Sequence, residues 1–226
     1  MDSARRDAIA RQFLPSRWHY YYARSKLATD PLYSAVLAAL AQTDAPLLDL
    51  GCGLGLLPHY CAAQGLVLPY RGLDNDARKI TLAKAAAARA GLTKTHFETA
   101  DLVQSCPPHQ GSVTLLDVLQ FVPTERLPDL IAQVAGCVSA GGRLIIRTGL
   151  QDAGWRTRVT RAADWFARAV QWMNAAPRAY PTRETLLELL AAQGLVADCR
   201  PLWGNTPFNN WLVVAQRPQP ATSADL

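Results

Sequence analysis

An aspartate and three glycines occupy alternate positions in the run DLGCGLG, which covers residues 49–55. Glycine lets a backbone turn tightly and lets a ligand approach without a Cβ in the way. The helix expected after this turn offers unpaired N–H groups to the polar end of a ligand. The dinucleotide fingerprint G-x-G-x-x-G does not fit, because its third glycine would fall on Leu56 or Pro58. The spacing therefore disfavours a nicotinamide-dependent oxidoreductase.

Two further acids follow the ends of the next two expected strands. Asp74 can accept both hydrogens of a ribose diol, and Asp101 can accept from an adenine amino group. A single aspartate at a strand end is often only a helix cap. Three acids, in order, at the ends of successive strands favour one shared ligand site.

The first acid restricts the charge of that ligand. Asp49 would repel a pyrophosphate and would attract an ammonium group. S-adenosylmethionine carries an ammonium, a sulfonium and a ribose but no phosphate. We therefore predict S-adenosylmethionine as the cofactor and S-adenosylhomocysteine as its product.

At these residues the chain resembles the class I S-adenosylmethionine-dependent methyltransferases, over roughly residues 45–216. The resemblance implies a Rossmann-like α/β fold with a seven-stranded, mostly parallel sheet whose last strand is antiparallel. It implies that Asp49 lies near the cofactor amino group, Asp74 at the ribose and Asp101 at the adenine. It also implies that Asp117 borders the methyl group. The cofactor-binding positions expected on this basis are Asp49, Gly51, Cys52, Gly53, Gly55, Asp74, Asn75, Asp101, Leu102 and Asp117.

Two other runs resemble methyltransferases of aryl-polyene (xanthomonadin-type) pigment biosynthesis. They are RWHYYYARSKLATDPLY at 17–33 and TPFNNW at 206–211. This resemblance implies methylation of a small hydroxyaryl acceptor. It leaves open whether oxygen or carbon is methylated, and whether the acceptor is free or bound to an acyl carrier protein.

Few side chains are candidates for a general base. We favour His19, in the aromatic run, over His59, His96 and His109, although a half-exposed helix histidine is the alternative. Many relatives carry histidine where Gln120 stands, and glutamine is no base, so we assign it polar contact with the substrate.

Other residues of the aromatic run are candidates for binding. Tyr21 and Tyr22 are candidates for the substrate pocket, with ordinary helix packing as the alternative. Arg24 and Lys26 can pair with the methionyl carboxylate of the cofactor, or lie in solvent.

Short apolar runs alternate with helical stretches from residue 46 onward, which predicts a parallel sheet with helices on both faces. We expect strands at 46–50, 67–73, 94–99, 112–118 and 142–148. We expect helices at 55–64, 76–90, 124–139 and 182–193. Two closing strands, at 195–203 and 208–216, are joined by turn residues and predict an antiparallel pair.

The first forty residues have helical patterns, and Asp30-Pro31 is a good helix start. We expect an N-terminal helical cap at 1–44, a cofactor-binding domain at 45–216 and a flexible tail at 217–226. A helical insertion or lid is expected at 151–180, where Trp155 is a substrate candidate. Plain packing of this insertion against the sheet is the alternative.

The composition is that of a globular protein, because 50% apolar and 18% charged residues exclude a disordered chain. There is no run of 18 uncharged apolar residues, and the N-terminus leads into no apolar signal core. Five cysteines lack C-x-x-C spacing. We therefore expect a cytoplasmic protein with reduced thiols, no membrane association and no bound metal.

The net charge is +5, and arginines gather late in the chain. They form either a solvated helix face or a surface for an anionic substrate or an acidic partner such as a carrier protein. These arginines are Arg143, Arg147, Arg156, Arg158, Arg161, Arg168, Arg178 and Arg183.

The alternative function is a nucleic-acid (RNA) methyltransferase that uses the same cofactor. It is disfavoured because the fourth strand lacks an N/D-P-P-Y end and the sequence shows no RNA-binding module. A non-catalytic subunit is also disfavoured, since all three cofactor acids are present. The oligomeric state stays open.

Overall fold

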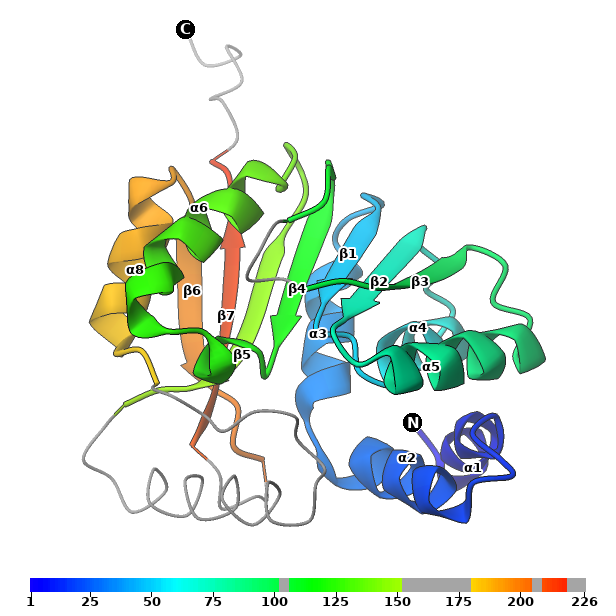
Figure 1. Ribbon diagram of the computed structural model, residues 1–226. Helices are drawn as coiled ribbons and strands as arrows, with labels where there is room; N and C mark the ends of the chain where they lie inside the picture. Colours follow the sequence, from blue (N-terminus) through cyan, green and yellow to red (C-terminus); the bar gives the residue numbers. More distant parts are fainter. Residues whose placement is uncertain (102–105, 152–179, 205–208, 219–226) are drawn as a thin grey trace, which may run out of the picture.

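The computed structural model describes residues 1–101, 106–151, 180–204 and 209–218. Its centre is a seven-stranded sheet in the order β3-β2-β1-β4-β5-β7-β6 (Figure 1). Strands β1 to β5 pair in parallel, whereas β7 is antiparallel to both β5 and β6. The expected sheet, with its antiparallel closing pair, is confirmed.

The strands are β1 Leu47–Leu50, β2 Tyr70–Asp74, β3 Thr95–Thr99, β4 Ser112–Leu116, β5 Leu144–Gly149, β6 Val196–Pro201 and β7 Asn210–Gln216. The α-helices are α1 Ser3–Arg11, α2 Arg17–Thr29, α3 Leu32–Leu40, α4 Leu56–Ala63, α5 Ala77–Arg89, α6 Leu127–Gly136 and α8 Arg183–Ala192. Short 3-10 helices follow β4 and precede α6, η1 at Leu119–Phe121 and η2 at Thr124–Arg126.

Alternate residues of the central strands face two separate cores. Leu47 and Ile145 pack with α1 to α5 on one face of the sheet. Leu48 and Ile146 pack with α6 and α8 on the other face. Period-two alternation in strands that are buried on both faces produces this helix–sheet–helix arrangement.

Several expected elements have different limits in the structure, of which three bear on the fold around the site. The strand expected at 67–73 begins only at Tyr70. The strand expected at 112–118 ends at Leu116, because Asp117 has a φ of 62° and cannot continue an extended chain. The helix expected at 124–139 starts as η2 and is α-helical only over Leu127–Gly136. Most of the expected insertion lies outside the described residues.

The helices expected in the first forty residues are confirmed as α1, α2 and α3. Figure 1 shows α1 and α2 beyond the edge of the sheet to which the parallel strands point. Asp30 ends α2, and its Oδ1 accepts a hydrogen bond of 2.9 Å from the N–H of Leu32 at the start of α3. The division of the chain at residue 44 stays a prediction, since α3 shares the core of the sheet domain.

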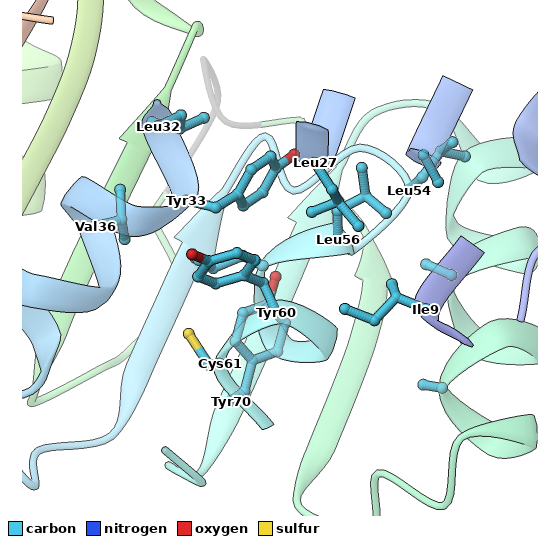
Figure 2. Close-up of a cluster of buried hydrophobic side chains, with 14 of the residues drawn as sticks. Ile9, Leu27, Leu32, Tyr33, Val36, Leu54, Leu56, Tyr60, Cys61 and Tyr70 are labelled. Atoms are coloured by element: carbon cyan, nitrogen blue, oxygen red, sulfur yellow. The ribbon is translucent and has the colours of Figure 1, made fainter. Parts of the chain in front are cut away.

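Figure 2 shows how the N-terminal helices join that core. The rings of Tyr33 on α3 and Tyr60 on α4 lie 5.6 Å apart, centre to centre. Ile9 of α1 and Leu27 of α2 point into the same cluster. Burying these side chains anchors α1 and α2 beside the carboxyl ends of the strands, where they can border a ligand.

Candidate functional site

The glycine loop between β1 and α4 combines two packed glycines with one open glycine. A Cβ at Gly51 would lie 2.4 Å from Val118 Cγ2, and one at Gly55 would lie 2.5 Å from Phe97 Cζ. A Cβ at Gly53 would meet nothing within 4 Å. The outer two glycines therefore let the loop pack against its neighbours, and the middle one faces open space.

Asp49 lies beneath this loop and is 2% exposed. Its carboxylate accepts hydrogen bonds from Tyr70 Oη at 2.6 Å and from Thr114 Oγ1 at 2.7 Å. Burial raises the pKa of Asp49 to about 6, although both hydrogen bonds lower it. A ligand cation close to the loop would favour the ionised form, so this buried acid suits an ammonium group.

Asp74 ends β2 and joins the glycine loop to the turn before α5. Its Oδ2 accepts from the N–H of Gly53 at 2.9 Å, and its Oδ1 accepts from the N–H of Asp76 at 2.9 Å. A carboxylate oxygen has more than one lone pair, so both oxygens can still accept from a diol. The side chain is held in place before any ligand arrives.

The remaining expected cofactor residues surround this point. Asn75 and Asp101 are exposed beyond β2 and β3, at the same edge of the sheet. Cys52 is partly buried, and burial raises the pKa of its thiol, so it is a neutral lining group. Leu102 lies outside the described residues.

Asp117 follows β4 and is bonded to a buried arginine. Arg147, near the end of β5, is 2% exposed. Its Nη2 donates to Asp117 Oδ2, and its Nη1 donates to both carboxylate oxygens of Asp30 at 3.0 and 2.9 Å. Burial opposes the charge of Arg147, but Asp117 and then Asp30 outweigh it and raise its pKa. Lys26 Nζ lies 2.7 Å from Asp30 Oδ2 and completes the cluster.

For Arg147, the structure corrects our interpretation that the arginines late in the chain form a solvated face or an anion-binding surface. This side chain lies in neither a solvated face nor an anion-binding surface, because two acids of the protein hold it in the core. Arg143 is half-buried and donates to Gln42 and Gln216. Arg183 is exposed. The other arginines of that set lie outside the described residues.

Helix α2 brings some of the expected aromatic residues toward this cluster. Tyr22 is half-buried and interacts electrostatically with Lys26 and Asp117, while burial raises the pKa of its phenol. His19 is half-buried at the start of α2, with Nδ1 at 2.6 Å from Ser16 Oγ. Burial lowers the pKa of His19, so the ring is neutral at pH 7. Tyr21, by contrast, is 52% exposed.

The two cations expected at the cofactor carboxylate already have acidic neighbours. Arg24 Nε lies 3.8 Å from Asp7 Oδ1, and Lys26 is paired with Asp30. Both pairs would have to loosen for the expected role, which stays a prediction.

Gln120 lies on η1 and is 8% exposed. Its Oε1 is buried, and no residue in the described parts of the chain donates to it. A buried acceptor without a donor is costly, so this oxygen suits a donor group of a ligand. The other substrate candidate, Trp155, lies outside the described residues.

From the sequence we did not assign Arg147, Asp30, Tyr70 or Thr114 to this site. One signal was available, because Arg147 interrupts the apolar run LIIRTG of a central strand. A charged side chain in such a strand needs a buried partner. The sequence does not show which acids those partners are.

A small apolar cavity of about 150 Å³ lies at the opposite edge of the sheet, where β1, β2 and β3 begin. Leu47, Tyr70 and Thr95 line it together with Pro58 of α4. None of its lining residues belongs to the glycine loop or is one of the three acids, although the Tyr70 hydroxyl donates to Asp49, so we do not assign the site to it.

The fold and this site define a class: an open α/β domain with an acid-flanked glycine loop at the carboxyl edge of its sheet. Residues 18–199 match the family described as "Methyltransferase domain". The chain therefore belongs to this family of methyltransferase domains. Such a domain implies the cofactor expected from the sequence, S-adenosylmethionine, and the open side of Gly53 leaves room for it.

Solved structures with the same fold include several methyltransferases. Magnesium protoporphyrin IX methyltransferase from Synechocystis, with bound S-adenosylhomocysteine, has a TM-score of 0.64 and 19% identity, over 83% of this chain and 82% of that one. A methyltransferase from Mesorhizobium loti has a TM-score of 0.65 and 21% identity, over 83% and 98%. Mitomycin 7-O-methyltransferase has a TM-score of 0.65 and 16% identity, over 93% and 60%. No curated protein matches the sequence.

Proposed function

We propose that the protein transfers a methyl group from S-adenosylmethionine to a hydroxyl of a small aromatic acceptor. The observation that carries the proposal is the joint placement of Gly53 and Asp74. The 2.9 Å hydrogen bond from the N–H of Gly53 holds the Asp74 carboxylate beside the one loop glycine that faces open space. A ribose needs a fixed acceptor of this kind next to a loop that it can approach closely.

When bound, the cofactor supplies a methyl group on a positively charged sulfur that is already a good leaving group. The protein has to hold that group and the acceptor oxygen in line. We assign Asp74 to the ribose and the field of buried Asp49 to the ammonium end. Positioning of this kind can lower an activation barrier by about 7–11 kcal/mol. A general base raises the rate by about 10²–10⁴-fold, which corresponds to about 3–5 kcal/mol of the barrier. The geometry of the loop and acids therefore matters more than any single base.

The proton of the acceptor hydroxyl needs a destination, and His19 is our candidate. Its ring can take a proton because it is neutral at pH 7, although burial disfavours the protonated form and lowers its pKa. The ring is oriented by Ser16, whose Oγ lies 2.6 Å from Nδ1. Tyr22 is placed nearer the Asp117–Arg147 cluster, where its ring can border an aromatic acceptor and its phenol stays protonated.

The hydroxyaryl acceptor, free or bound to an acyl carrier protein, is the narrower part of the proposal. It is supported by the resemblance of residues 17–33 to methyltransferases of aryl-polyene pigment biosynthesis, since these residues form α2 and its corner with α3. One similar fold belongs to a natural-product O-methyltransferase, mitomycin 7-O-methyltransferase. The cytoplasm is the proposed location.

Calorimetric titration with S-adenosylhomocysteine tests the cofactor part. Wild-type protein should bind with one-site behaviour, and Asp74→Ala should weaken binding by roughly 1.5–3 kcal/mol, the scale of lost hydrogen bonds to a charged group. Asp129→Ala is a matched control, because Asp129 is an exposed acid on α6, 3.8 Å from Arg126. Equal affinities for all three proteins would remove Asp74 from the site.

Mass spectrometry tests the acceptor part. A hydroxybenzoyl compound, free or attached to a carrier protein, is incubated with the protein and S-adenosylmethionine. The proposal predicts a gain of one methyl group in at least one form. Tight cofactor binding without methylation of either form would contradict the aromatic acceptor while leaving the cofactor site intact.

A further inference from the structure

The buried cluster around Arg147 connects the N-terminal helices to the edge of the cofactor loop. Arg147 belongs to β5, Asp30 to the corner between α2 and α3, and Asp117 to the residue that follows β4. The side chains are 3% exposed at Arg147, 10% at Asp30 and 35% at Asp117. The exposure therefore increases toward Asp117, whose carboxylate is the end of the cluster that a ligand can reach.

Asp117 is fixed to Arg147 through both its backbone and its side chain. Its N–H donates to the carbonyl oxygen of Arg147 at 2.9 Å, and its carboxylate accepts from the guanidinium. It is also the one non-glycine residue with a positive φ, 62°, in the part of the chain that the structure describes. A side chain in this backbone conformation needs surrounding contacts that hold it there.

The next residue carries this constraint to the cofactor loop. Val118 packs so closely on Gly51 that a Cβ there would lie 2.4 Å from Val118 Cγ2. On the other side of the cluster, Asp30 holds Arg147 with both oxygens, pairs with Lys26 and accepts from the N–H of Leu32. Contacts therefore run without a break from the α2–α3 corner to the glycine loop.

We propose that Arg147 and Asp30 are positioning residues for Asp117, so that the docked α2–α3 corner sets the direction of its carboxylate toward the cofactor sulfonium. The inference rests on the proposed function. A planar guanidinium is suited to this task, because it can bind two carboxylates at once in fixed directions, whereas an ammonium is a point charge.

The consequence is a measurable preference for the charged cofactor. S-adenosylmethionine carries one positive charge more than S-adenosylhomocysteine, at the sulfonium. An Asp117 carboxylate that points toward the sulfonium favours S-adenosylmethionine. The ratio of the dissociation constants for the two compounds therefore measures whether the carboxylate is correctly directed. Asp117→Asn should reduce that preference about tenfold.

Arg147→Lys separates position from charge. It keeps the positive charge that Asp30 and Asp117 require but cannot bridge both of them, so the preference should fall about threefold to tenfold. If only the positive charge at residue 147 matters, Arg147→Lys should leave the ratio of the two dissociation constants unchanged. A merely structural role predicts a lower Tm with the ratio unchanged, and that result would overturn the proposal.

A double-mutant cycle of Asp30 and Asp117 is a second test of the proposal. Asp30→Asn should lower the preference in wild-type protein but change it little in an Asp117→Asn background, because the two acids act through one guanidinium. Additive effects of the two substitutions would refute the coupling. Asp129→Asn, on the exposed face of α6, is the control and should change neither the ratio nor the cycle. Wild-type protein that binds neither compound would refute the proposed function itself, which distinguishes the two failures.

Discussion

The buried side chain of Asp49 indicates the charge of the ligand and also predicts that cofactor affinity depends on pH. The run DLGCGLG predicted an acid at the cofactor loop, and the structure buries that acid to 2% exposure. The sequence could not show that Tyr70 and Thr114 hold it, because β2 and β4 flank β1 only in the folded sheet. Its protonation therefore depends on contacts between distant segments.

Cofactor affinity should fall as the pH drops below about 6. Burial raises the pKa of Asp49 from 3.8 to about 6, and the ammonium of the ligand is attracted only to the ionised form. Affinity for S-adenosylhomocysteine should decrease by up to about tenfold per pH unit over this range. Titration calorimetry from pH 5 to pH 8 measures it, and Asp49→Asn should abolish the dependence. The same slope in Asp49→Asn would assign it to another group.

The raised pKa also acts on stability, with a definite sign. The protonated form of Asp49 is favoured in the folded protein, so the stabilisation linked to it is complete below pH 3.8 and is lost as the pH rises through about 6. Bound cofactor opposes this loss, because it favours the ionised acid.

At the scale of elements, periodicity and caps predicted most of the sheet and its helices. The pattern failed at Asp117, where an apolar run continues beyond the strand although the backbone turns at a positive φ. It also failed at Arg147. The period-two alternation of a strand predicts that this position is buried in the core, but it does not predict that an arginine there has two acidic partners. Both failures lie in one cluster beside the proposed site, where tertiary contacts override local preference.

Two helix caps provide a matched test of what the elements contribute. Asp76 caps α5 beside the cofactor site, and Thr182 caps α8 on the opposite face of the sheet. Each substitution by alanine should cost about 0.5–2 kcal/mol of unfolding free energy, the usual loss of an N-cap. Only Asp76→Ala should also weaken binding of S-adenosylhomocysteine. The substitution keeps the backbone N–H that donates to Asp74 Oδ1, but it removes the carboxylate that accepts from the N–H of Arg78 and so loosens the turn after Asp74. Denaturant titration and calorimetry measure the two effects. A binding defect in Thr182→Ala would contradict this division.

At the scale of the whole molecule, the carboxyl edge of the sheet collects the glycine loop, the acids and the N-terminal helices. No helix in the described ranges is long and apolar enough to span a membrane. The alternation of strands and helices predicted this edge as the ligand side, as in other open α/β sheets. The sequence alone did not predict that α3 would pack into the same core as α4 and so fix α2 beside the site.

The central claim is that this edge binds S-adenosylmethionine through the glycine loop and Asp74. A crystal structure with S-adenosylhomocysteine tests it most directly. We predict the ligand over Gly53, with both ribose hydroxyls within hydrogen-bonding distance of the Asp74 carboxylate. An empty loop, or the ligand bound at another place with Asp74 uninvolved, would contradict the claim.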